Sequence, residues 1–107
     1  MSFAFRVVAG LAAAVGRDAP VTVALVFARI GAAGPSGVLQ ATLARELRVS
    51  DAALSRALRA LEVRGVVSTM PDPADGRHRI VRVTDKGAEV IQTVTRNAAP
   101  NHVGEQT

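Results

Sequence analysis

The chain has 107 residues, enough for one small domain, and its 13 basic and 9 acidic residues give a formal net charge of +4. It contains no cysteine, which excludes disulfides, cysteine nucleophiles, iron–sulfur clusters and zinc fingers. His78 and His102 lie far apart without metal-ligand spacing, and no nucleophile–base pair, paired carboxylates or phosphate loop occurs. We therefore expect neither an enzyme nor a bound cofactor or metal.

The first residues form an apolar stretch that has two interpretations. It could be a signal peptide, because one positive charge, Arg6, precedes the apolar run. The charge-free run from Val7 to Gly16 is short for such a segment and far too short to span a bilayer. The preferred interpretation is a helix at residues 3–15 that is apolar on nearly every side, packed partly on the domain and partly on a second copy of the chain.

Residues 17–20 interrupt this pattern and precede a second predicted helix. Asp18 can cap a helix, and Pro20 suits a first helical turn. The stretch from Val21 to Ala33 is mostly apolar, which predicts a helix in the core. Gly34, Pro35, Ser36 and Gly37 then predict a loop.

Two further helices are predicted on either side of a tight turn, from Leu39 to Arg48 and from Asp51 to Arg64. Ser50 precedes the second of them as a capping hydroxyl, and Gly65 follows it as a left-handed terminator. Val49 is the apolar turn residue expected to reach the core.

The helix at 51–64 has two different faces when it is projected at 100° per residue. Its apolar stripe, which predicts the core side, consists of Leu54, Ala57, Leu58 and Leu61. The opposite side is small and basic, and consists of Ala52, Ser55, Arg56 and Arg59. Such a face suits the major groove of DNA, because small residues allow close approach and arginine reaches guanine edges or phosphates. The alternative is a solvated face in which Arg59 pairs with Glu62.

Asp51 stands at the start of this helix, where a carboxylate interacts favourably with the helix dipole. Near DNA it would repel a phosphate or accept from a cytosine amino group. We prefer the role at the helix start.

Two short β-prone runs follow, Val66–Met70 and Ile80–Val83. The nine residues between them, 71–79, are turn formers and charges, too many for a two-residue hairpin turn, so we expect a hairpin with an extended basic tip. Arg77 and Arg79 are candidates for the minor groove, and Asp75 is expected to orient Arg77 or to brace the turn. His78 is expected to be a surface residue. The alternative is a flexible charged loop.

Thr84 is expected to cap a last helix at Asp85–Thr95, and residues 97–107 are expected to form a flexible tail. The predicted fold class is mainly α with a small β-hairpin (α+β). Residues 1–96 are expected to form one domain. The order of its elements is that of a winged helix-turn-helix.

The segment from Ala41 to Ile91 resembles the DNA-binding core of MarR-type transcriptional regulators. The matching motifs are LA-x-x-L-x-V-S, S-R-x-L-x-x-LE-x-x-G, P-D-P-x-D-x-R and V-T-x-x-G. The resemblance implies a homodimeric repressor or activator on a palindromic promoter site, with Arg77 at the wing tip and with Ser50, Ala52, Ser55 and Arg56 in the major groove.

The basic helix face, the basic hairpin and the family resemblance predict binding to double-stranded DNA in the bacterial cytoplasm, in association with the nucleoid. The homodimer would form through the N-terminal apolar helix and the C-terminal helix. A small-molecule effector is compatible with the resemblance, although the sequence names no ligand. The predicted DNA-binding residues are Gln40, Ser50, Asp51, Ala52, Ser55, Arg56, Arg59, Asp75, Arg77 and Arg79.

Two other functions fit the same fold. One is a plasmid or phage winged-helix protein for replication or partition, which binds repeated DNA sites. The other is a protein-interaction module that has lost DNA binding, although such a module has no need for the basic helix face.

Overall fold

The computed structural model describes residue 10 and residues 21–98. Apart from residue 10, the predicted dimer helix at 3–15 lies outside the described residues, as do the helix-start residues Asp18 and Pro20 and the predicted tail beyond residue 98. The elements in chain order are α2 (Val21–Ala32), a short 3-10 helix η1 (Gly34–Ser36), β1 (Val38–Leu39), α3 (Gln40–Leu47), α4 (Asp51–Val63), β2 (Val67–Asp72), β3 (Asp75–Val83) and α5 (Asp85–Ala98).

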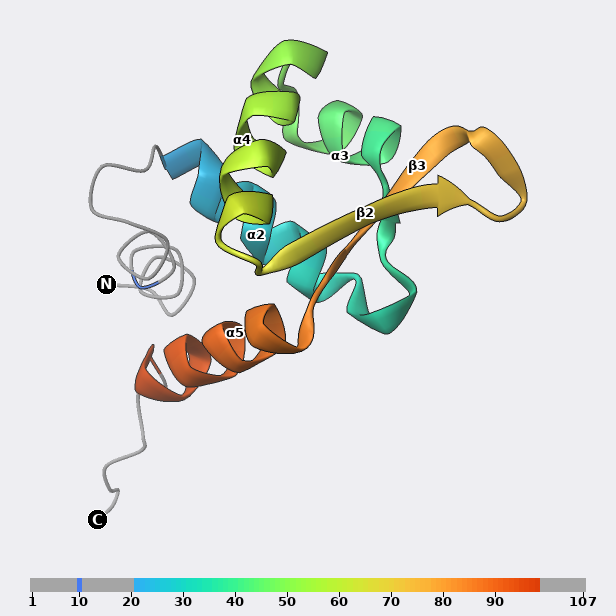
Figure 1. Ribbon diagram of the computed structural model, residues 1–107. Coiled ribbons are helices and arrows are strands. Elements are labelled where there is room, and N and C mark those ends of the chain that lie inside the picture. Colours follow the sequence, from blue (N-terminus) through green and yellow to red (C-terminus); the bar gives the residue numbers. More distant parts are fainter. Residues whose placement is uncertain (1–9, 11–20, 99–107) are drawn as a thin grey trace.

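Three helices, α2, α3 and α4, gather on one side of the domain, and the β2–β3 hairpin projects away from them (Figure 1). Helix α5 leaves the base of that hairpin in the opposite direction. This arrangement confirms the predicted fold class, mainly helical with a small β-hairpin. No helix in the described ranges is both long and apolar enough to cross a membrane.

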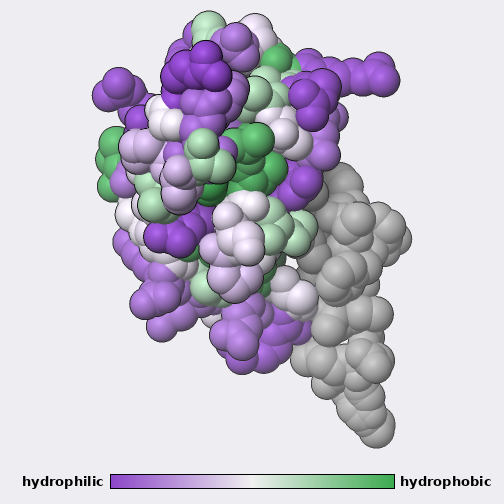
Figure 2. Space-filling view, turned by 90° about the vertical axis from the view of Figure 1, so that its right-hand side faces the viewer, coloured by the Kyte–Doolittle hydropathy of each residue, from purple (hydrophilic) through white to green (hydrophobic). Residues whose placement is uncertain are grey.

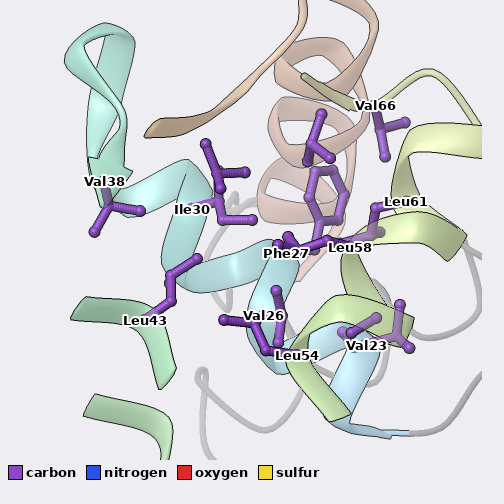
Figure 3. Close-up of a cluster of buried hydrophobic side chains, with 14 of the residues drawn as sticks. Val23, Val26, Phe27, Ile30, Val38, Leu43, Leu54, Leu58, Leu61 and Val66 are labelled. Atoms are coloured by element: carbon purple, nitrogen blue, oxygen red, sulfur yellow. The ribbon is translucent and has the colours of Figure 1, made fainter. Parts of the chain in front are cut away.

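Helix α2 supplies the centre of the core. Its buried residues recur at helical spacing, and Phe27 and Ile30 are fully buried. They pack against the apolar stripes of α3 and α4, as Figure 3 shows. Burial of each large side chain contributes roughly 2–3 kcal/mol. The predicted core stripe of α4 is confirmed, because its four members are all buried: Leu54, Ala57, Leu58 and Leu61.

The turn between α3 and α4 occupies residues 48–50. Arg48 adopts the left-handed conformation with φ 56°, and the Val49 N–H donates to the Ala44 carbonyl at 3.1 Å. Val49 is half-buried against the core, as predicted. The Ser50 hydroxyl accepts from the Ala53 N–H at 3.0 Å, which confirms the predicted cap.

Helix α4 ends as predicted, because Gly65 is left-handed with φ 74°. The predicted start of the preceding helix was wrong by one residue. Leu39 lies in β1, where it pairs with Ile80, and α3 begins at Gln40.

The sheet has three antiparallel strands in the order β1-β3-β2. The prediction of a long hairpin loop was wrong, because β2 continues to Asp72 and β3 starts at Asp75. Pro71 is compatible with β2 because β2 is an edge strand, where a missing N–H costs no ladder bond. The register shifts after Pro71, which pairs with Arg79, so residues 76–78 of β3 are passed over.

Helix α5 is docked on the turn between α4 and β2. The Thr84 hydroxyl accepts from the Gly87 N–H at 3.1 Å, which confirms the predicted cap, and donates to the Gly65 carbonyl at 2.6 Å. Gly87 is buried, and a Cβ there would overlap the carbonyl oxygen of Val66. This close approach explains the V-T-x-x-G motif.

The end of α5 differs from the prediction. The helix continues past the predicted end at Thr95 to Ala98. Asn97 and Ala98, which were predicted to belong to the tail, are therefore helical.

Candidate nucleic-acid interface

The outer face of α4 points away from the core. Ala52, Ser55, Arg56 and Arg59 are all exposed, on the side opposite the buried leucines. The small side chains leave the helix backbone accessible, and the two arginines extend beyond it. A helix of this shape can lie close to a duplex and donate to guanine edges or phosphates.

The start of α4 is held by Ser50 rather than by Asp51. The Ser50 hydroxyl caps the Ala53 N–H, so its oxygen is already engaged. Asp51 is exposed in the first turn, where its charge interacts favourably with the helix dipole. It borders a shallow hollow that also includes Gln40 and Ala41 at the start of α3, and Arg77, His78 and Arg79 of the hairpin.

At the hairpin tip, Asp75 and Arg77 form a clamp. Arg77 donates from Nε to Oδ1 at 3.0 Å and from Nη2 to Oδ2 at 2.9 Å, and its backbone N–H donates to Oδ1 at 3.1 Å. The prediction that Asp75 supports Arg77 is confirmed in both forms, since the carboxylate orients the guanidinium and braces the backbone. The Arg77 side chain is nevertheless 86% exposed, so it remains available to a partner.

The clamp has an electrostatic consequence. The hydrogen bonds from the Arg77 side chain, followed by the one from its backbone, hold the pKa of Asp75 below its ordinary value. The same pair raises the pKa of Arg77. His78 is exposed, as predicted, and its Nε2 lies 3.6 Å from Asp75 Oδ2.

Arg79 pairs with Pro71 in the outer part of the hairpin and lines a hollow with residues of α4. Its Nη2 donates to the Thr69 hydroxyl at 3.2 Å, and that hydroxyl donates to Glu62 Oε2 at 2.8 Å. The alternative pairing of Arg59 with Glu62 is not found among the ion pairs of the described residues. Sequence reasoning missed Thr69, whose only signal is its place on the same sheet face as Arg79, and that place requires the register of β2 and β3.

A second hollow lies between α4 and the hairpin, and side chains from α3, α4, β2 and β3 line it. The lining residues are Gln40, Ser55, Arg56, Leu58, Arg59, Glu62, Thr69 and Arg79. The packing of α3 and α4 beside the hairpin thus brings five of the predicted DNA-binding residues to one concave surface: Gln40, Ser55, Arg56, Arg59 and Arg79. The side of the molecule toward which the hairpin projects is mostly hydrophilic, and hydrophobic residues, in green, occupy smaller areas of it (Figure 2).

Arginine and amide donors around a concave surface suit phosphate and base edges, because guanidinium groups bind both in a forked geometry. Residue 10 and residues 21–98 contain no cluster of three or more His, Asp or Glu side chains that could hold a metal ion.

The tight turn between α3 and α4, with α4 exposed and a basic hairpin beside it, is the geometry of a winged helix-turn-helix. Residues 22–87, more than half of the chain, match the family described as winged helix DNA-binding domain. The chain belongs to this family, which is one of DNA-binding domains and not of enzymes.

Individual proteins show the same relationship. The uncharacterized HTH-type transcriptional regulator YdgJ of Bacillus subtilis is 38% identical over 56 residues, which cover 52% of this chain and 34% of YdgJ. A mutant of MarR from Escherichia coli, solved in complex with operator DNA, has a TM-score of 0.69 at 24% identity, over 91% of this chain and 66% of MarR. The regulator BldR of Sulfolobus solfataricus has a TM-score of 0.61 at 30% identity, over 76% of this chain and 58% of BldR.

These similarities confirm the resemblance to MarR-type regulators at the level of the fold. The chain spans about a third of the length of YdgJ and 66% of the MarR chain.

Proposed function

We propose that the protein is a transcriptional regulator that binds double-stranded DNA sequence-specifically, as a homodimer on a palindromic operator. Helix α4 would lie in the major groove, and the β2–β3 hairpin, here called the wing, would reach the adjacent minor groove. The protein would act in the cytoplasm, on the nucleoid. The observation that carries this proposal is the shared concave surface of Arg56, Arg59 and Arg79 between α4 and the wing.

The positions of the side chains support a division of labour. Ser55 and Arg56 lie in the middle of the exposed face of α4, where base edges are within reach of a helix seated in the groove. Arg77 projects from the wing tip with its guanidinium plane set by Asp75, which suits insertion into a narrow groove of negative potential. The Ser50 cap fixes the start of α4, so the exposed N–H groups of its first turn can meet a phosphate.

The size of the chain supports the dimer. A chain of this length buries only about 65% of its unfolded surface, so pairing adds burial that a monomer lacks. Light scattering after gel filtration should give twice the chain mass, and a monomer at micromolar concentration would contradict the homodimer.

The proposal is tested by selection from a pool of random duplex DNA, followed by sequencing of the retained fraction. A palindrome with half-sites about one helical turn apart is expected. The apparent affinity should fall steeply with salt, because phosphate contacts release counterions. Tandem direct repeats would instead support a replication or partition protein, and no retention at low salt would reject DNA binding.

Arg56 provides the sharpest variant for this test. Arg56→Ala should relax the base preference at one position of the selected site, at a cost of about 1–3 kcal/mol for that base pair. Arg82→Ala is the matched control, because Arg82 is an exposed arginine on the other face of β3. Equal weakening of all sequences by Arg56→Ala would reassign Arg56 to a phosphate.

A further inference from the structure

We infer that Thr69 is a positioning residue, fixed by Glu62, that holds the guanidinium of Arg79 in the hollow between α4 and the wing, ready to meet a DNA phosphate. This inference rests on the proposed function. Thr69 and Glu62 lie outside the predicted DNA-binding set. Two hydrogen bonds through Thr69 join α4 to both β2 and β3 of the wing.

The direction of the two hydrogen bonds follows from chemistry. A carboxylate only accepts and a guanidinium only donates, whereas a threonine hydroxyl can do both. The single hydroxyl hydrogen of Thr69 goes to Glu62 at 2.8 Å, which turns its lone pairs toward Arg79 Nη2 at 3.2 Å. These two hydrogen bonds, here called the relay, therefore run in one direction: Arg79 donates to Thr69, and Thr69 donates to Glu62. The relay needs all three side chains.

The sheet register explains why these residues meet. Thr69 pairs with Val81 and Arg79 pairs with Pro71, so Thr69 and Arg79 share one face of the hairpin on adjacent strands. Near the domain this face is apolar and buried, with Val67 and Val81 in the core. Farther along it becomes polar, at the level where it borders the hollow beside α4.

The relay has a clear effect on the hollow. An arginine side chain is long and flexible, and fixing it costs rotamer entropy when it binds. With one N–H held by Thr69, the remaining donors of Arg79 keep a defined direction and can serve a phosphate. The backbone that connects adjacent major and minor grooves must pass between a helix in one and a wing in the other, which is where this guanidinium lies.

Glu62 supports Arg79 only through Thr69. Its carboxylate also lines the same hollow as three arginines, where its negative charge opposes DNA binding whether or not Thr69 is bonded to it. Its structural contribution is to anchor the Thr69 hydroxyl to α4.

The test measures binding to a fluorescein-labelled pool of random duplexes about 30 base pairs long, by anisotropy over a series of salt concentrations. The variants are Thr69→Val, Thr69→Ser, Arg79→Ala and the double variant Thr69→Val with Arg79→Ala. Thr69→Val keeps the shape and the strand preference of the side chain but removes the hydroxyl. Thr93→Val is the matched control, on an exposed position of α5.

Thr69→Val should weaken binding about fivefold, the effect of one lost hydrogen bond of ordinary strength. Thr69→Ser, which retains the hydroxyl, should stay within about twofold of the parent. In the Arg79→Ala background Thr69→Val should have no further effect, because a positioning residue acts only through the residue it positions. Arg79→Ala should lower the salt slope by about one.

Glu62→Ala separates the two influences of the carboxylate. In the Arg79→Ala background it should tighten binding, because it removes a negative charge near DNA. In the parent background that gain should be offset by the loss of the anchor for Thr69. The difference between the two backgrounds measures the coupling.

Three results would overturn the inference while the parent protein still binds the duplex: Thr69→Val binding as tightly as Thr93→Val, Thr69→Val weakening binding equally in both backgrounds, or Arg79→Ala leaving affinity and salt slope unchanged. Absence of binding by the parent protein at low salt would reject the proposed function and the inference with it. Thermal unfolding of every variant guards against loss of fold as the cause.

Discussion

Replacing Gly87 by alanine tests how α5 is attached to the rest of the domain. In an ordinary helix, alanine is favoured over glycine by about 1 kcal/mol. Here the added Cβ would overlap the Val66 carbonyl oxygen and approach the Val66 carbonyl carbon to 3.0 Å and its Cα to 3.3 Å. All three are backbone atoms, so relief requires the start of α5 to move away from the turn between α4 and β2.

That movement breaks the hydrogen bonds from the Thr84 hydroxyl to the Gly65 carbonyl and from the Thr84 N–H to the Val66 carbonyl. Each contributes about 1 kcal/mol, and residual overpacking costs about 1–3 kcal/mol. After subtraction of the helix preference, Gly87→Ala should lower the free energy of unfolding by about 2–4 kcal/mol.

Urea denaturation followed by circular dichroism measures this change. Gly76→Ala is the matched control, because a Cβ at Gly76 meets nothing within 4 Å, and its effect should be within about 0.5 kcal/mol. A neutral or stabilising Gly87→Ala would refute the assignment of this glycine to close packing, since helix preference alone would then account for the result.

Substitutions at three further positions test the cap, the core and the wing. Ser50→Ala should lower the free energy of unfolding by about 1 kcal/mol in urea denaturation, because the Ala53 N–H loses its acceptor, whereas Ser50→Asp should retain most of it; equal losses would argue against capping. Phe27→Ala should cost about 3–5 kcal/mol because the ring is fully buried, and a loss under about 1 kcal/mol would contradict its place in the core. Arg77→Gln should raise the pKa of Asp75, because the carboxylate loses its charged donor. The pKa is measured from the pH titration of the Asp75 carboxyl carbon in NMR spectra. Because the pKa of Asp75 is lowered in the folded protein, the clamp is intact at neutral pH and is lost as the pH falls through that lowered value; an unchanged titration midpoint would contradict the clamp.

The helices were predictable because their signals are local. Ser50 and Thr84 cap the residues that immediately follow them, and Gly65 ends α4 with a left-handed backbone. Each of these contacts spans three residues or fewer, so neighbouring residues suffice to indicate it. The outward face of α4 follows from helical periodicity in the same way.

The wing was the element that local signals described worst. Proline, aspartate and glycine at residues 71–76 are typical of loops, yet most of these residues belong to strands. The edge position of β2 makes Pro71 acceptable, and an edge is defined only by the neighbours a strand has in the sheet. Strand β1 was missed because its two residues pair with β3, some forty residues away.

The sequence by itself determined the helix-turn-helix, its core stripe, its caps and the residue types that DNA binding requires, because these depend on periodicity and on contacts within one turn of helix. Only the tertiary structure decided which of those residues share a surface. The register of β2 on β3, and the packing of α4 beside that hairpin, bring Arg79, Thr69 and Glu62 together. A register is set by the packing of the whole sheet face against the core, so no short stretch of the chain contains it.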